Sequence, residues 1–430
     1  MGAFFLSFSL LLVIGLPVAI GLGLACVVFL WWSGNLDLLA AFPQRMVAGI
    51  DQFVLLTIPL FILSGSLMNA GGLTDQMVRF SRALVGHIHG GMAQVNVVSN
   101  MLFSGVSGSA TAEASALGSV LIPAMVREGY PPAFAAAFTG VTSVLGPIIP
   151  PSITMIVYGV LTGTSIAKLF LSGVLPGLLI GAALMAYAYW QARRHGYAVS
   201  PRQSWAERWS ATWQALPALI LPVIILGGIL TGVFTPTESA AVAVLYALLL
   251  AGLYYRTLSW SMLYAALVDT AVVTAGIMII VGVASMVAFA ITFDQIPAKV
   301  AQAMLSITSD KTLLLLIING ALLVLGFFLE PISIMILTLP VLVPLIKSLG
   351  VDLVHFGMVM TLNVCLGLVH PPLGICLYIV SGISGVKVEK ISMAALPMIG
   401  ICLLLLMLIT YVPWLSLWLP GVFEAASAGR

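Results

Sequence analysis

Two helix-breaking passages interrupt the apolar runs of this chain: Gly146-Pro-Ile-Ile-Pro-Pro-Ser152 and Gly367-Leu-Val-His-Pro-Pro-Leu-Gly374. The 430 residues are 61% hydrophobic and only 7% charged, whereas an average soluble domain is about 25% charged. The composition therefore predicts an all-α polytopic membrane protein, with roughly ten spans of ~20 apolar residues each. Unwound backbone is tolerated in lipid only where protein or a cavity surrounds it. Both passages are thus expected inside the protein, near the middle of the bilayer.

Each passage has a companion segment that is apolar on both sides of a polar break. Met92–Met125 is interrupted by the tip Ser104–Thr111, and Leu313–Lys347 is interrupted by Gly326–Pro331. Each limb is too short to span, so we interpret both segments as re-entrant hairpins. Short amphipathic arms are predicted before them, at Thr74–His89 and Asp294–Ser309.

The two passages belong to an internal repeat. Pro123 recurs as Pro344 and Pro176 recurs as Pro397, in both cases 221 residues later. The same displacement relates a further set of glycines and prolines: Gly129, Gly146, Pro150 and Pro151 to Gly350, Gly367, Pro371 and Pro372. Five predicted crossings separate the first arm from the second. Because five is odd, the halves are expected to face opposite sides of the membrane as inverted repeats.

The other predicted elements set the orientation. We expect spans at Phe4–Trp32, Phe53–Asn69, Pro131–Gly163, Lys168–Trp190, Trp213–Gly232, Glu238–Tyr255, Val268–Phe293, His355–Ser381 and Ile391–Trp418, and a loop at Asn35–Gln52. The longest charged loop, Arg193–Trp209, is expected in the cytoplasm because basic loops stay inside. That orientation places ten Lys and Arg residues inside and six outside.

Hydroxyls and carboxylates near the hairpin tips are the candidate substrate ligands. The first tip carries Ser107, Ser109 and Thr111, and small residues there also suit close helix packing. An intramembrane carboxylate is costly and marks function by default, so Glu113 and Glu330 are candidates, with tip anchoring or helix capping as the alternative. The predicted substrate-binding set is Ser107, Ser109, Thr111, Glu113, Pro150 and Pro151.

The broken helices suggest cation sites. Adjacent prolines unwind a helix and free backbone carbonyls, and oxygen ligands suit a hard cation such as sodium. Thr142 and Asn363 hold equivalent positions one turn before the breaks and offer side-chain oxygens. His370 is read as a hydrogen-bonded structural residue in preference to a proton relay. The predicted metal set is Ser104, Gly108, Thr142, Gly146, Glu330, Asn363, Gly367, His370, Pro371 and Gly374.

Enzymatic readings find little support in the sequence. It has no His-Glu-x-x-His, no Gly-x-Ser-x-Gly and no paired intramembrane aspartates, and its four cysteines show no zinc spacing. Ser107 and Ser109 have no nearby histidine to act as a base. An intramembrane enzyme and a channel remain the alternatives from other classes.

The motifs Ser107-Gly-Ser-Ala-Thr-Ala112, Gly146-Pro-Ile-Ile-Pro-Pro-Ser152 and Pro371-Pro-Leu-Gly374 resemble the large membrane subunit of the TRAP (tripartite ATP-independent periplasmic) transporters, the DctM-like family. Leu-Pro-Gly at the end of Phe170–Gly177 fits as well. One departure concerns His370, where the family usually has threonine. If that hydroxyl helped to hold sodium, one ligand is lost here, although the backbone carbonyl remains.

The resemblance implies a bacterial inner-membrane importer with an elevator mechanism, driven by two or more sodium ions. It implies a scaffold with the first arm at residues 1–90, transport-domain halves at 91–190 and 311–385, a loop, scaffold helices and second arm at 191–310, and a C-terminal helix at 386–430. It also implies two partners, a small four-helix membrane subunit and a periplasmic binding protein. The small subunit is expected to be a separate polypeptide, because no room for it precedes Phe4. The expected substrates are small organic anions such as dicarboxylates, keto acids or sialic acid, and a symporter that needs no binding protein is the alternative.

Overall fold

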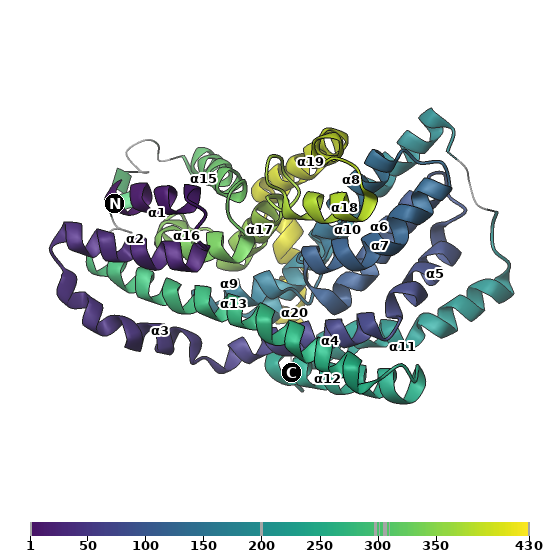
Figure 1. Ribbon diagram of the computed structural model, residues 1–430, viewed down its shortest axis with the longest axis horizontal. Coiled ribbons are helices and arrows are strands. Elements are labelled where there is room, and N and C mark those ends of the chain that lie inside the picture. Colours follow the sequence, from purple (N-terminus) through teal and green to yellow (C-terminus); the bar gives the residue numbers. More distant parts are fainter. Residues whose placement is uncertain are drawn as a thin grey trace.

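The computed structural model of the protein describes residues 2–197, 201–295, 299–300, 302–303, 308 and 310–428, and this part of the chain is helical without strands (Figure 1). Seven of its helices are long and apolar enough to cross a membrane: Phe53–Ala70, Ile166–His195, Trp205–Leu230, Pro236–Tyr254, Trp260–Phe293, Pro331–Ser348 and Val388–Tyr411. Shorter apolar helices pack among them. The predicted all-α membrane fold is confirmed.

The N-terminal apolar run forms a pair of helices, so the prediction of a single span at Phe4–Trp32 is wrong. Helix α1 (Gly2–Val13) and helix α2 (Val18–Ser33) pack against each other, and the ring centres of Phe4 and Phe29 lie 6.4 Å apart across this contact. Between them Gly15 adopts a φ of 88°, which glycine tolerates. Pro17 follows and cannot continue a helix from the preceding turn. The chain therefore reverses where a kink was expected.

The segment Asn35–Gln52 is also more ordered than the loop expected there. It contains a short 3₁₀ helix, η1 (Leu36–Ala41), and helix α3 (Phe42–Ile50). Pro43 lies in the first turn of α3, where its missing N–H costs nothing. Helix α3 packs along α13 (Trp260–Phe293), and the Arg45 guanidinium lies 4.3 Å from the centre of the Phe289 ring.

The first half of the chain builds the predicted arm, hairpin and broken helix in order. After η2 (Phe53–Leu56) and α4 (Thr57–Ala70), the arm is α5 (Leu73–Val85). The hairpin is α6 (Gly91–Ser107) and α7 (Ala110–Arg127), joined at Gly108, whose φ is 60°. The broken helix is α8 (Pro132–Thr142) with η3 (Ser143–Leu145), then α9 (Ile153–Thr162). Helix α10 (Ile166–His195) follows.

The second half has the same order of elements. The hairpin is α15 (Lys311–Gly326) and α16 (Pro331–Ser348), the broken helix is α17 (Leu353–Leu366) and α18 (Ile375–Ser384), and α19 (Val388–Tyr411) follows. Helix α7 begins at 110 and ends at 127, and α16 begins at 331 and ends at 348, so both bounds are displaced by 221 residues. Unlike the short limb expected from the sequence, α16 has the length of a span.

The middle of the chain supplies α11 (Trp205–Leu230), α12 (Pro236–Leu249), the π-helical turn η4 (Leu250–Tyr254) and α13. The charged segment predicted as the loop Arg193–Trp209 is shorter than expected, because α10 continues to His195 and α11 begins at Trp205. Ser204 and Glu207 form a capping box that starts α11 early. Most of the predicted second arm, Asp294–Ser309, lies outside the described residues.

The last apolar run divides at a proline, so the single span predicted at Ile391–Trp418 is wrong. Helix α19 ends at Tyr411, and α20 (Trp414–Ala428) begins directly after Pro413. Helix α20 packs along α10, and an ion pair joins Lys168 to Glu424 across this contact.

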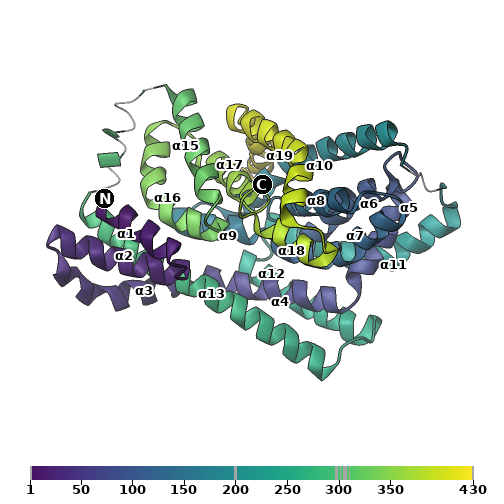
Figure 2. The ribbon, with the colours of Figure 1, turned by 45° about the horizontal axis from the view of Figure 1, so that its top comes forward.

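The two halves interlock through their hairpins. Helix α7 of the first hairpin packs against α18, and helix α16 of the second hairpin packs against α9 (Figure 2). Each hairpin therefore contacts the second segment of the other half's broken helix. This exchange brings both tips and both breaks to the centre of the molecule.

Candidate functional site

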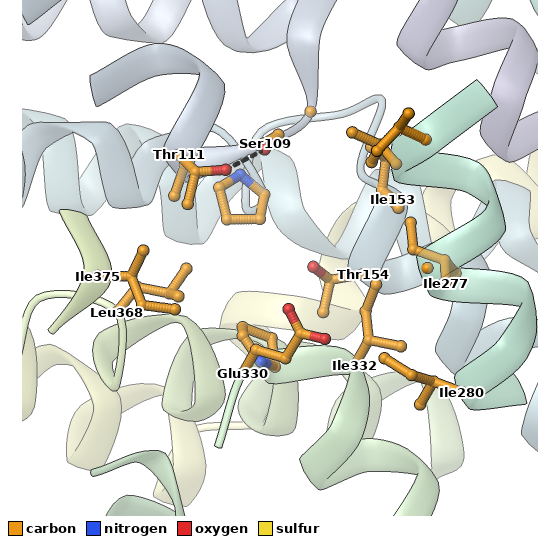
Figure 3. Close-up of a pocket in the computed structure, with 17 residues that line it drawn as sticks. Ser109, Thr111, Ile153, Thr154, Ile277, Ile280, Glu330, Ile332, Leu368 and Ile375 are labelled. Atoms are coloured by element: carbon orange, nitrogen blue, oxygen red, sulfur yellow. Dashed lines mark hydrogen bonds between the residues drawn. The ribbon is translucent and has the colours of Figure 1, made fainter. Parts of the chain in front are cut away.

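A cavity of about 340 Å³ lies where the two hairpin tips and the two breaks meet (Figure 3). Helix α13 closes one side of it through Val272, Val273, Gly276, Ile277 and Ile280. The other lining residues come from both halves: Gly108, Ser109, Ala110, Thr111, Pro147, Ile153, Thr154, Glu330, Pro331, Ile332, Leu368 and Ile375. Residues of both hairpins and of both breaks therefore line one shared cavity.

Four helices begin at this cavity. The first residues of α7, α9, α16 and α18 all line it, namely Ala110, Ile153, Pro331 and Ile375. A helix N-terminus carries unpaired N–H groups and a partial positive charge of about half a unit. Such ends are ready-made sites for anions. The backbone therefore supplies positive potential from both halves of the chain.

The side chains around the cavity are mostly apolar, with a few polar groups among them. Ser109 and Thr111 are hydrogen-bonded to each other through their hydroxyls at 3.1 Å. Across the cavity the Glu330 carboxylate and the Thr154 hydroxyl point into the same space (Figure 3). No lysine, arginine or histidine belongs to the lining as the structure describes it. Any anion bound here is held by helix ends and hydroxyls.

A second cavity, of about 470 Å³, adjoins the first and shares Ser109, Thr111, Ile153, Val272 and Val273 with it. It lies between α4, the first hairpin and α13, and its polar lining includes Ser66, Asn69, Ser107, Ser115 and Asp269. Sequence reasoning missed Asp269, Asn69 and Thr154 as lining residues. Asp269 carried a usable signal, because a carboxylate in an otherwise apolar helix marks function by default.

Glu113 lines neither cavity. Its carboxylate is fully buried behind the first tip, where Ser107 Oγ donates to Oε1 at 2.9 Å and Ser104 Oγ lies 3.5 Å from Oε2. Gly146 packs directly on this carboxylate, so a Cβ added at Gly146 would lie 2.6 Å from Oε1. The contacts match the tip-anchoring alternative for Glu113, and they join the first hairpin to the first break.

The remaining predicted residues of the first half lie around this junction. Gly108 lines the first cavity and leaves no room for a side chain, because an added Cβ would lie 2.5 Å from the Pro151 carbonyl oxygen. Pro150 and Pro151, joined by a cis peptide bond, lie outside both linings. Pro147 takes the lining position at this break.

The second half makes its junction from backbone alone. Gly326 of the hairpin meets Gly367 of the break, and a Cβ added at Gly367 would lie 2.8 Å from both the Cα and the carbonyl oxygen of Gly326. His370 lies outside the lining, with its ring centre 4.7 Å from that of Phe327 and its Nδ1 2.6 Å from the Pro371 carbonyl oxygen. The His370 carbonyl accepts from the Gly374 N–H at 3.0 Å. These contacts agree with the structural reading of His370.

Thr142 and Asn363 both bond to asparagines of the preceding hairpin helix. Thr142 Oγ1 donates to Asn96 Oδ1 at 2.8 Å, and Asn100 Nδ2 lies 3.2 Å from Thr142 Oγ1. Asn363 Nδ2 donates to Asn319 Oδ1 at 2.8 Å. Two amide oxygens in these networks, Asn100 Oδ1 and Asn363 Oδ1, are buried without a partner among the described residues. Each of the two networks thus contains one unpaired amide oxygen.

Comparison with known proteins gives a consistent result. Residues 5–415 match the family model for the DctM component of the tripartite ATP-independent periplasmic transporters. The chain is 40% identical over 415 residues to the isethionate TRAP transporter permease protein of Oleidesulfovibrio alaskensis, covering 96% of this chain and 65% of that relative. It is 38% identical to the sialic acid TRAP transporter large permease protein of Vibrio cholerae, with 96% of each covered.

Solved structures resemble the fold at much lower identity. The YdaH transporter of Alcanivorax borkumensis aligns with a TM-score of 0.63 at 14% identity, covering 90% of this chain and 89% of that one. The MtrF efflux pump of Neisseria gonorrhoeae aligns with a TM-score of 0.58 at 13% identity, covering 89% and 85%. Both likenesses concern the arrangement of the helices.

Proposed function

Because this chain belongs to the DctM component family of the TRAP transporters, and is therefore a large permease and not an enzyme, we propose that it imports a small organic acid together with sodium ions. The substrate site is the 340 Å³ cavity between the hairpin tips. Its volume lies at the lower end of the range for small-molecule sites, about 300–1,000 Å³.

The observation that carries this proposal is the set of four helix N-termini around a cavity with no cationic side chain among its described lining residues. Their N–H groups and the hydroxyls of Ser109, Thr111 and Thr154 can donate to a carboxylate. Broken helices whose positive ends face an anion are a recurring device in secondary transporters. Organic acids are also what the two TRAP relatives compared above are named for, isethionate and sialic acid.

Glu330 gives the cation a role in binding. Its carboxylate points into the same cavity that receives the anion, and like charges in a desolvated space repel strongly. A sodium ion at the second tip offsets this repulsion, so that anion and cation enter together. Asn363 Oδ1 and Asn100 Oδ1 are unpaired oxygens suited to the two predicted sodium sites.

Movement of the site across the membrane is proposed to follow an elevator scheme. The two hairpins and broken helices form the transport domain, in inverted halves, and the other spans form the scaffold. Each positive charge carried inward across a 100 mV potential contributes about 2.3 kcal/mol. Two sodium ions with a monoanion leave one net charge for this potential to drive.

Two partners and a location complete the proposal. A small membrane subunit assembles with this chain in the bacterial inner membrane, and a periplasmic binding protein delivers the substrate. The Oleidesulfovibrio relative is named as a DctMQ protein and is longer than this chain, which agrees with a second membrane component. The loop between α10 and α11 faces the cytoplasm.

The test is uptake by proteoliposomes that contain this chain, the small subunit and the binding protein, assayed with a panel of labelled organic acids. We expect uptake of one acid that requires an inward sodium gradient and all three components. Replacing sodium by choline is the matched control. Uptake that persists in choline contradicts the coupling, and uptake without the binding protein favours the simpler symporter.

A further inference from the structure

Arginines stack on aromatic rings where α10 ends and α11 begins. The guanidinium carbon of Arg193 lies 5.8 Å from the Tyr189 ring centre, and that of Arg194 lies 5.4 Å from the Trp190 ring centre. On α11, Arg208 lies 5.6 Å from the Trp205 ring centre. These rings are exposed at 39%, 53% and 81%, so they cover little protein. We call these six residues the arginine–aromatic cluster.

The turn between α5 and α6 contacts the cluster both on α10 and on α11. The His89 ring lies 5.4 Å from the Tyr189 ring, beside Arg193. Two residues earlier, His87 Nδ1 lies 3.5 Å from an Nη of Arg208. Gln94 Nε2 also donates to the Met185 carbonyl at 2.9 Å and fixes α6 on α10. The arginines of both helices therefore flank one short turn.

The charge of this cluster is not neutralised. No carboxylate lies within 4.0 Å of Arg193, Arg194 or Arg208 in the part of the chain that the structure describes. The nearest acid in sequence, Glu207, is engaged in the helix cap with Ser204. The exposed side chains of Arg193 and Arg194 therefore carry positive charge with no carboxylate partner in the described chain.

The position of the cluster fits the edge of a bilayer. Helix α10 has 30 residues and is about 45 Å long at 1.5 Å per residue, whereas a hydrocarbon core is about 30 Å thick. Its last turns therefore reach the headgroup region. A stripe of exposed tryptophans, Trp205, Trp209 and Trp213, runs along α11 at intervals of one turn. Tryptophan and tyrosine concentrate at membrane interfaces.

We propose that the arginine–aromatic cluster binds the phosphodiester headgroup of an anionic phospholipid. Arg208, beside His87, donates to the phosphate oxygens, and Arg193 and Arg194 add positive charge at the end of α10. The tryptophan stripe of α11 lies along the glycerol and upper acyl chains. The requirement for acyl chains separates this site from one that captures free phosphate. The charge of the cluster favours a lipid over an apolar protein surface as the occupant.

The experiment is native mass spectrometry of the full chain purified in detergent, titrated with phosphatidylglycerol, phosphatidylcholine or water-soluble glycerol phosphate. We expect bound phosphatidylglycerol at concentrations where the other two compounds give none. Arg193→Gln with Arg208→Gln is expected to weaken its retention about tenfold or more, since each arginine near an anionic lipid contributes about fivefold. Arg79→Gln with Lys390→Gln removes equal charge from exposed positions elsewhere and serves as the matched control.

Several outcomes overturn the proposal. Equal retention of phosphatidylcholine, binding of glycerol phosphate alone, or equal losses in the two double variants each contradict a lipid site at this cluster. Displacement of the lipid by the small membrane subunit assigns the surface to a protein contact instead. The single variant Arg208→Lys keeps the charge but removes the planar guanidinium group, which can pair with phosphate through two N–H donors. It is expected to unfold at the same temperature as the unsubstituted protein and to retain the lipid less well, which separates binding from folding.

Discussion

The two hairpin tips have the same arrangement of helices but present different side chains to the cavity. Ser109 and Glu330 stand at the N-cap positions of α7 and α16, 221 residues apart. The first tip presents hydroxyls to the cavity and buries its carboxylate, Glu113, against its own break. The second tip presents its carboxylate to the cavity and meets its break through two glycines. The two helices thus start at matching positions, while individual side chains decide what each half contributes.

The glycine junction of the second half gives the largest expected effect. A methyl group at Gly367 meets Gly326 backbone within 3 Å, and backbone cannot rotate away as a side chain can. We expect Gly367→Ala to destabilise the protein by about 1–3 kcal/mol and to abolish uptake. Thermal unfolding in detergent and proteoliposome uptake measure these effects. Gly320→Ala, on the same hairpin with nothing within 4 Å of the added Cβ, should leave both unchanged.

A double-mutant cycle sharpens the contrast between the junctions. At Gly146 the obstacle is the Glu113 side chain, so Gly146→Ala should cost far less in a Glu113→Ala background than in the native chain. In the second half the equivalent background is Ile334→Ala. There Gly367→Ala should destabilise the protein as much as it does in the native chain. Relief in both halves, or in neither, contradicts the difference described between the two junctions.

The two carboxylates should separate transport from stability. Glu330 makes one long hydrogen bond, in which Ser333 Oγ lies 3.4 Å away. The unfolding temperature of Glu330→Gln should therefore be close to that of the unsubstituted protein. Uptake by this variant is expected to fall about tenfold or more, because a hydrogen bond to a charged group contributes about 1.5–3 kcal/mol. Half-maximal uptake should also require a higher sodium concentration. Glu113→Gln should lower the unfolding temperature instead. A loss of stability in Glu330→Gln with unchanged sodium dependence would refute the role proposed for the second tip.

Substitutions in the buried amide networks behind the tips are expected to destabilise the protein as much as Gly367→Ala does, or less. Thr142→Val removes one hydrogen bond each from Asn96 Oδ1 and Asn100 Nδ2, while Asn100 still donates to Asn96, so the expected cost is about 0.5–1.5 kcal/mol. Asn363→Leu removes the amide that donates to the Oδ1 and to the carbonyl oxygen of Asn319, so a comparable loss is expected. The measurement is again thermal unfolding. Thr162→Val, at the last residue of α9 where the hydroxyl is only partly buried, serves as the control and should change little.

The smallest effect concerns the first tip. Ser109 Oγ lies 3.5 Å from the Ala112 N–H, at the outer limit of a hydrogen bond, so Ser109→Ala should cost about 0.5 kcal/mol, the low end for a cap. Uptake should fall only a few fold, because Thr111 and the helix ends remain. A loss as large as that of Glu330→Gln would mean that the first tip, and not the second, controls transport.

The sequence predicted the pattern of breaks because glycine and proline act locally on the backbone. Gly146–Ser152 and Gly367–Gly374 interrupt helices in the structure as expected. The linings of the two cavities were harder to predict, because tertiary packing of α9 brings Thr154 to the first cavity, and that of α13 and α4 brings Asp269 and Asn69 to the second. The same local reasoning predicted a kink at Gly15 and Pro17, where the chain in fact reverses. These two residues suit a kink and a reversal equally, and the packing of α1 on α2 decides between them.

The location of the substrate is the central claim, and thiol protection tests it most directly. The four native cysteines are buried, so a single cysteine introduced as Thr111→Cys can be labelled against a low background. We predict that the transported acid and sodium together slow its alkylation in the reconstituted complex, whereas Ser210→Cys, on the exposed start of α11, labels at an unchanged rate. Alkylation of Thr111→Cys at the same rate with and without acid and sodium would contradict a substrate site between the tips.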